Sequence, residues 1–113
     1  MPGNALGRLR KGREFDLVYS EGTVIGGPLF VVRFRPNASE ANRWGFAVGK
    51  KMAPKAVDRN RVRRQLREAA RELDVAAGYD LVVTARPSIL NARFAAIQTE
   101  LERSLARAGR NAP

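Results

Sequence analysis

Residues 43–73 read RWGFAVGKKMAPKAVDRNRVRRQLREAAREL and predict a strand, a loop and a helix in succession. The first seven residues, 43–49, are rich in strand-forming residues and predict a strand. A loop with lysines and a proline follows. A helix is then expected from about Ala56 or Asp58 to about Leu73, with Asp58 as its capping residue. A strand followed by a long helix favours an architecture in which helices pack on a sheet.

The expected helix has two faces of different chemistry. At about 100° per residue, one stripe is apolar and predicts a buried face: Val62, Leu66, Ala69 and Leu73. The roughly opposite face is continuously cationic, with Asn60 joining it near the helix start: Arg63, Arg64, Arg67 and Arg71. An ordinary solvated face mixes charges of both signs, because arginines at successive i, i+4 positions repel one another. We therefore interpret the arginine face as a surface that binds a polyanion.

The charge of the chain is concentrated in the same region. The 113 residues carry 21 Lys and Arg against 11 Asp and Glu, a net charge of +10. Residues 43–71 hold ten of these cations and two of the anions, a net +8, which leaves +2 for the rest. Such concentration predicts a polyanionic partner, with nucleic acid as the leading candidate and an anionic membrane surface as the second.

The remaining segments predict helices and strands in alternation. A short helix is expected over residues 12–20, with Phe15 and Tyr19 on one face and Gly22 ending it in the left-handed conformation. Residues 29–35 predict a strand, and the simplest connection to the strand at 43–49 is a hairpin.

The C-terminal part of the chain predicts one more strand and one more helix. Residues 80–85 are apolar enough for a strand buried on both faces. The last helix is expected over residues 92–106, with a buried stripe of Phe94, Ile97, Leu101 and Leu105. The length suits a single α/β sandwich domain over residues 1–113, with mobile ends at 1–7 and 108–113.

The absence of cysteine and histidine removes several classes of chemistry. Disulfides, zinc fingers and cysteine nucleophiles need cysteine, and Ser–His–Asp catalysis and imidazole metal sites need histidine. No apolar run approaches the roughly 20 residues that span a bilayer. The start of the chain lacks the apolar stretch of a secretory signal, so we expect a cytoplasmic protein.

The central stretch contains an ordered set of motifs. A strand ending Gly45-Phe-Ala-Val-Gly-Lys-Lys51 precedes a short loop, and Arg59-Asn60-Arg61 then opens the basic helix. In this order the motifs resemble the protein subunit of bacterial ribonuclease P, which carries an Arg-Asn-Arg signature in the same setting. The stretch from Arg8 to Gly22 resembles the N-terminal helix of that family, and Gly78 to Arg86 resembles its last strand. The resemblance covers about residues 8–107.

The resemblance implies an α+β fold, a two-layer sandwich of element order αβββαβα. Its helices pack on a small mixed sheet that contains a left-handed βαβ crossover, against the strong right-handed preference. This order requires a short additional strand near Thr23 to Ile25. One departure is visible: the loop Met52-Ala53-Pro54-Lys55 is one residue longer than the family's usual pattern, lacks its glycine and adds a proline.

The resemblance also implies a function. Ribonuclease P removes the 5′ leader of precursor tRNA, and in bacteria a large RNA is the catalyst and the protein is a non-catalytic cofactor. The sequence agrees, because Glu14 and Asp16 point in different directions on a helix, as do Glu100 and Glu102, and neither pair makes a metal-binding cluster. Magnesium is expected to enter only through the RNA and its substrate. The expected partners are the catalytic RNA and precursor tRNA, with no membrane, no DNA and a monomeric protein.

Two sets of binding residues follow from the resemblance. The set expected to contact the catalytic RNA is Lys50, Lys51, Lys55, Arg59, Asn60, Arg61, Arg63, Arg64, Arg67 and Arg71. The set expected to contact the single-stranded leader in a cleft is Phe15, Tyr19, Phe30 and Arg33. Bases stacking on aromatic rings is tolerant of sequence, as many different leaders require. From the residues alone, core packing is the alternative for Phe15 and Tyr19, and Trp44, Phe46 and Phe94 are interpreted as core.

Three other classes of protein fit parts of the sequence. A structural RNA-binding protein of ribosomal type, with no role in cleavage, would have the same composition and charge. A helix-turn-helix DNA-binding protein needs two adjacent helices, whereas strands flank the basic helix here. A membrane-surface helix would carry bulky aromatic residues on its apolar side, whereas this helix carries Val, Leu and Ala.

Overall fold

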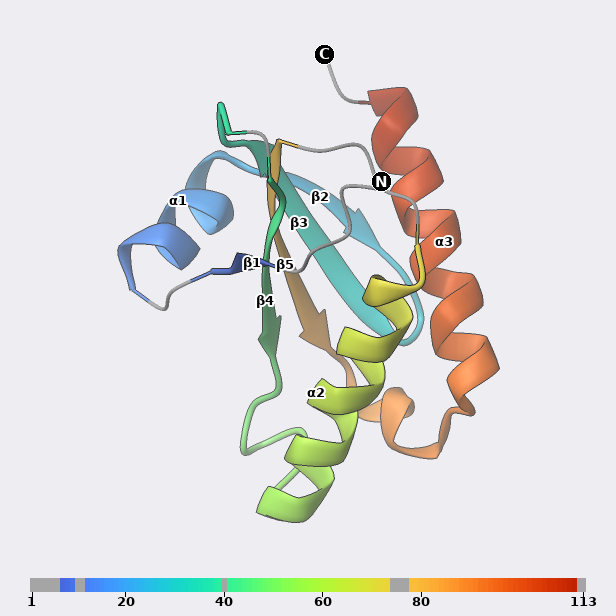
Figure 1. The fold of residues 1–113 in the computed structure, drawn as a ribbon. Coiled ribbons are helices and arrows are strands. Elements are labelled where there is room, and N and C mark those ends of the chain that lie inside the picture. The colour runs from blue at the N-terminus through green and yellow to red at the C-terminus, as the bar shows by residue number, and fades with distance from the viewer. Residues whose placement is uncertain (1–6, 10–11, 40, 74–77, 112–113) are drawn as a thin grey trace.

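A computed structural model describes residues 7–9, 12–39, 41–73 and 78–111 (Figure 1). Its helices and strands follow the predicted order, with a two-residue strand before the first helix and a 3-10 helix after the last strand as additions. The elements are β1 (Gly7–Arg8), α1 (Arg13–Glu21), β2 (Thr23–Gly26), β3 (Phe30–Pro36), β4 (Arg43–Ala47), α2 (Ala56–Arg71), β5 (Tyr79–Ala85), η1 (Pro87–Asn91) and α3 (Phe94–Asn111).

The strands form one mixed sheet in the order β1-β4-β5-β3-β2. β1 and β5 flank β4 in parallel, whereas β3 runs antiparallel to both β5 and β2. The predicted hairpin between the strands at 29–35 and 43–49 is therefore wrong, because β5 lies between them and pairs with both. Five of the seven β5 residues are buried, which confirms the strand predicted to be buried on both faces.

The connection from β4 through α2 to β5 is the unusual feature of the topology. In Figure 1 both strands run downward, β5 lies to the right of β4, and α2 lies in front of them. A parallel crossover of this kind is left-handed, as the resemblance implies and against the usual preference. The short strand required near Thr23 is also present, as the edge strand β2.

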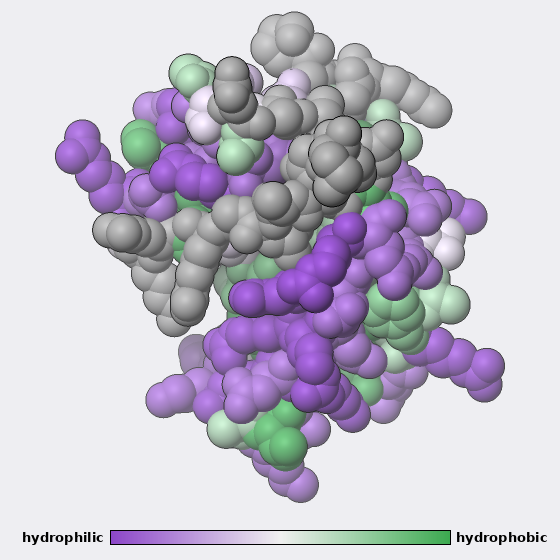
Figure 2. Space-filling model, viewed as in Figure 1, coloured by the Kyte–Doolittle hydropathy of each residue, from purple (hydrophilic) through white to green (hydrophobic). Residues whose placement is uncertain are grey.

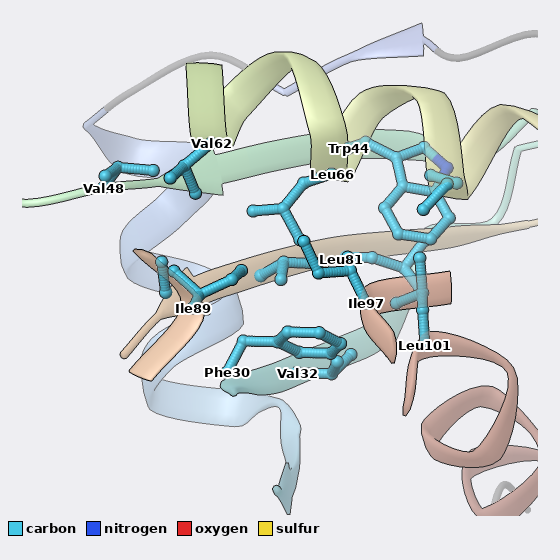
Figure 3. Packing of buried hydrophobic residues seen from close by; sticks show 14 of the residues in the cluster. Phe30, Val32, Trp44, Val48, Val62, Leu66, Leu81, Ile89, Ile97 and Leu101 are labelled. Carbon is cyan, nitrogen blue, oxygen red and sulfur yellow. The ribbon is translucent and has the colours of Figure 1, made fainter. Parts of the chain in front are cut away.

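Two hydrophobic clusters hold the layers together. The larger cluster joins one face of the sheet to α2 and α3, with Phe30, Leu66, Leu81, Ile97 and Leu101 among its fully or almost fully buried members (Figure 3). The predicted stripes on both helices are confirmed as the faces that pack in this cluster, although their members Leu73, Phe94 and Leu105 are only partly buried. The smaller cluster lies on the other face of the sheet under α1 and consists of Leu9, Val18 and Val82, with Phe15 packed against it.

The N-terminal region differs from the prediction in two details. The first helix begins at Arg13, and Gly7–Arg8 forms the edge strand β1, so Arg8 is not part of a helix as the resemblance indicated. Gly22 ends the helix with φ −78°, which is not left-handed. A Cβ at this position would lie 2.3 Å from the carbonyl oxygen of Val18, so close packing of the backbone is what favours glycine here.

The two ends of the chain were predicted to be mobile. Gly7 pairs in the sheet, and α3 continues through Asn111, so these residues have regular structure. The rest of both predicted mobile ends, at 1–6 and 112–113, lies outside the described residues. Within the described residues, no helix is long and apolar enough to cross a membrane.

Candidate nucleic-acid interface

The loop before α2 and the exposed side of that helix carry a cluster of cations. Figure 2 shows a largely hydrophilic surface over this helix. We name as the cationic surface the exposed members of the predicted RNA-binding set: Lys50, Lys51, Lys55, Asn60, Arg64, Arg67 and Arg71. Within the described residues, none of the three lysines makes an ion pair, and Arg71 pairs with the exposed Glu68 at 3.5 Å. This surface is available to phosphate groups.

Three arginines of the predicted RNA-binding set instead hold main-chain carbonyls. Arg59 donates from Nη1 to the carbonyl oxygens of Ala53 and Pro54, at 2.9 and 2.8 Å. Arg61 donates from Nη2 to the carbonyl oxygen of Leu90 at 3.3 Å. Arg63 makes a longer contact of 3.5 Å with the carbonyl oxygen of Val48.

The start of α2 differs from the prediction that Asp58 caps it. The residue at the N-cap is Lys55, whose side chain makes no capping bond, and Asp58 lies inside the first turn. Its carboxylate is 3.8 Å from Arg61, so it contributes to a weak local ion pair. The dipole of α2 adds to the positive potential of the lysine loop.

The face of the sheet under α1 carries the second predicted surface. Because side chains alternate along a strand, Val31 and Arg33 on β3 share this face with Val82 and Thr84 on the neighbouring β5. Tyr19, 42% exposed, extends from α1 over them. Its ring centroid is 4.7 Å from the guanidinium carbon of Arg33. Its hydroxyl lies 3.2 Å from Oγ1 of Thr84.

Phe15 occupies a more protected place on the same helix. Its ring is half-buried against the smaller cluster and lies directly over Gly45 of β4. A Cβ at position 45 would lie 2.4 Å from Cζ of Phe15, so only glycine permits this contact. Phe15 thus combines core packing with partial exposure, whereas Tyr19 is the more accessible ring.

Phe30 does not belong to this surface. It has no exposed area and lies among Val32, Leu81 and Ile97 on the opposite face of the sheet (Figure 3). Phe30 and Arg33 are three residues apart in one strand, so they must point to opposite faces. Its prediction as a leader contact was wrong, because alternation along β3 places Phe30 on the face opposite to Val31 and Arg33.

The aromatic residues interpreted as core lie between the sheet and the helices. Trp44 is buried and stacks on Phe46, with ring centroids 5.9 Å apart. Phe46 is half-buried, and the guanidinium carbon of Arg67 lies 5.7 Å from its ring centroid. Phe94 is half-buried and packs against the larger cluster.

An ionic network fixes α1 to the sheet and was not predicted. Arg43 donates from Nε and Nη2 to the buried carboxylate of Asp80, at 2.8 and 2.7 Å, and from Nη1 to Glu14 of α1 at 2.8 Å. Asn37 also donates to Asp80, at 2.9 Å. The hydrogen bond to Asp80 raises the pKa of the Arg43 guanidinium above its ordinary value, so this cation stays charged. In the sequence Arg43 counts only as one of the ten cations of residues 43–71, because no local pattern reveals a partner 37 residues away.

Known proteins are similar to this chain in sequence and in fold. The family described as Ribonuclease P matches residues 4–109. A ribonuclease P protein component from Caldanaerobacter subterraneus subsp. tengcongensis is 39% identical over 102 residues, which cover 88% of this chain and 87% of the relative. The chain belongs to the ribonuclease P protein family.

Solved structures of ribonuclease P proteins agree in fold. The protein from Thermotoga maritima has a TM-score of 0.81 at 33% identity, covering 88% of this chain and 96% of that one. The protein from Staphylococcus aureus has a TM-score of 0.79 at 30% identity, covering 89% and 94%. As a ribonuclease P protein component, the chain functions in the processing of tRNA 5′ ends.

Several carboxylates of the chain have structural partners. Glu100 accepts hydrogen bonds from the backbone N–H groups of Leu29 and Phe30, which ties α3 to the start of β3. Glu14 is held by Arg43. Among the described residues, no three carboxylates lie close enough together to hold a metal ion.

Proposed function

We propose that the protein is the non-catalytic subunit of a ribonucleoprotein in which RNA is the catalyst. The cationic surface would contact phosphates of the ribonuclease P RNA. The rings on α1 would contact the single-stranded 5′ leader of precursor tRNA. Magnesium would enter with the RNA and the substrate, and the protein would act as a monomer in the cytoplasm.

The arrangement of two different surfaces around one sheet carries this proposal. α1 and α2 cover opposite faces of the sheet (Figure 1), so the two surfaces can engage two segments of RNA at once. The cationic surface offers point charges and guanidinium forks, which bind phosphate without reading sequence. The α1 side offers Tyr19 stacked with Arg33, which suits unpaired bases. A structural RNA-binding protein needs only the first surface.

Leader-dependent affinity tests the proposal. The protein is combined with a bacterial ribonuclease P RNA, and affinities are measured for precursor tRNA with a leader and for mature tRNA without one. Tyr19→Ala should weaken binding of only the leader-bearing substrate, by about 5- to 150-fold, because stacking contributes about 1–3 kcal/mol per base. Tyr19→Phe keeps the ring and serves as the matched control. Equal losses for both substrates would contradict a leader site on α1.

A further inference from the structure

The loop before α2 carries three exposed lysines that need a fixed shape to act together. Lys50, Lys51 and Lys55 lie within six residues of one another, so their charges repel. One backbone hydrogen bond folds the loop on itself, from the N–H of Ala53 to the carbonyl oxygen of Gly49 at 3.0 Å. Pro54 has no N–H to add another. The far end of the loop is held by α2, since the carbonyl oxygen of Lys55 accepts hydrogen bonds from the N–H groups of Asp58 and Arg59, both at 3.1 Å. The stretch before Lys55 needs a side chain from outside the loop.

Arg59 supplies that side chain. One nitrogen, Nη1, reaches two consecutive carbonyl oxygens of the loop, those of Ala53 and Pro54, at 2.9 and 2.8 Å. Ala53 is fully buried, so one end of this contact is anchored in the core. Hydrogen bonds from a charged donor are stronger than neutral ones. Arg59 is itself held in place, because it belongs to α2, whose residues Val62 and Leu66 are buried in the core.

We propose that Arg59 is a positioning residue that holds the loop of residues 50–55 in the shape in which its lysines meet RNA phosphates. Its Nη1 protons are committed to the loop carbonyls, so its main effect on RNA affinity acts through Lys50, Lys51 and Lys55. The RNA part of this inference rests on the proposed function. The clamp itself is a property of the free protein.

The first arm of the test uses the free protein and hydrogen exchange. Arg59→Ala should raise the exchange rate of the Ala53 amide by about tenfold or more, because the bond from that amide to Gly49 loses its support. The amide of Leu66 should keep its protection, which shows that α2 remains folded. Arg64→Ala is the charge-matched control: it removes an exposed arginine of the same helix that contacts no loop carbonyl among the described residues. Unchanged exchange at Ala53 in Arg59→Ala would overturn the clamp.

The second arm measures affinity for ribonuclease P RNA in a double-mutant cycle with Lys55→Ala. If Arg59 positions Lys55, the combined loss of RNA affinity should be smaller than the product of the two single losses by about fivefold or more. The reason is that Lys55 contributes little to affinity when Arg59 no longer holds the loop. Arg64→Ala combined with Lys55→Ala should be additive within about twofold. Additivity of Arg59→Ala with Lys55→Ala would instead make Arg59 an independent phosphate contact and overturn the proposal.

The two arms separate this inference from the proposed function. A protein that fails to bind the RNA at all would overturn the proposed function and the RNA part of the inference together. The exchange measurement would still decide whether Arg59 clamps the loop.

Discussion

Removing the carboxylate of Asp80 should destabilise the fold far more than removing a surface carboxylate. The Asp80 side chain is 3% exposed and accepts two hydrogen bonds from Arg43 and one from Asn37. Breaking a buried ion pair costs about 3–5 kcal/mol. Arg43 is 37% exposed and keeps Glu14, so part of its lost interaction is regained from water and from that partner. We therefore expect Asp80→Ala to cost about 2–3 kcal/mol in free energy of unfolding.

Urea unfolding with matched variants measures this loss. The control is Glu21→Ala, which removes a carboxylate from an exposed pair with Arg35 at 3.1 Å and should cost less than about 1 kcal/mol. The slope m should stay the same for both variants, so that the shift of the midpoint reports stability. In a thermal melt, Asp80→Ala should lower Tm by about 10 °C. A loss no larger than that of Glu21→Ala would refute the role assigned to the network.

Three further changes separate packing from RNA contact. Gly45→Ala should lower the free energy of unfolding in urea by about 1–3 kcal/mol, because its Cβ would lie 2.4 Å from Phe15. Gly49→Ala is the control, because its Cβ would meet open space and should leave stability unchanged. Equal effects of the two changes would contradict the close contact. Phe30→Ala should lower the free energy of unfolding by about 3–5 kcal/mol, but the folded variant should keep the preference for leader-bearing tRNA. A selective loss of that preference would show that Phe30 does belong to the leader site. Arg64→Ala should reduce the slope of log affinity against log salt for ribonuclease P RNA by about 0.7–0.9 at unchanged stability; an unchanged slope would exclude it from phosphate contact.

Local patterns predicted the elements of this fold well. The stripe of Val62, Leu66 and Ala69 is fully buried, because an amphipathic helix must cover its apolar side. The apolar run at 80–85 became the central strand β5, where both faces are covered. Both patterns arise from residues close together in sequence, so they can be recognised without the structure.

Pairing between distant strands was not predictable in the same way. A hairpin between β3 and β4 was the simplest connection, yet β5 enters between them from 32 residues further along the chain. The alternation of side chains is compatible with either arrangement. The left-handed crossover was implied by the resemblance and not by any pattern of residues.

In the candidate site, too, local patterns were predictable and contacts between distant residues were not. Charge density located the cationic surface, but it did not distinguish Arg64, which is exposed, from Arg59, which is bonded to its own loop. Carbonyl partners carry no side-chain signal, so only the structure reveals them. By contrast, the opposite facing of Phe30 and Arg33 follows from strand alternation and was available in the sequence.

Cleavage of precursor tRNA by a bacterial ribonuclease P RNA, at a magnesium concentration too low for the RNA alone, tests the central claim most directly. We expect that adding the protein restores cleavage at the mature 5′ end and that the protein without the RNA cleaves nothing. A protein that binds the RNA yet leaves cleavage unchanged would have no role in cleavage and would be a structural RNA-binding protein instead.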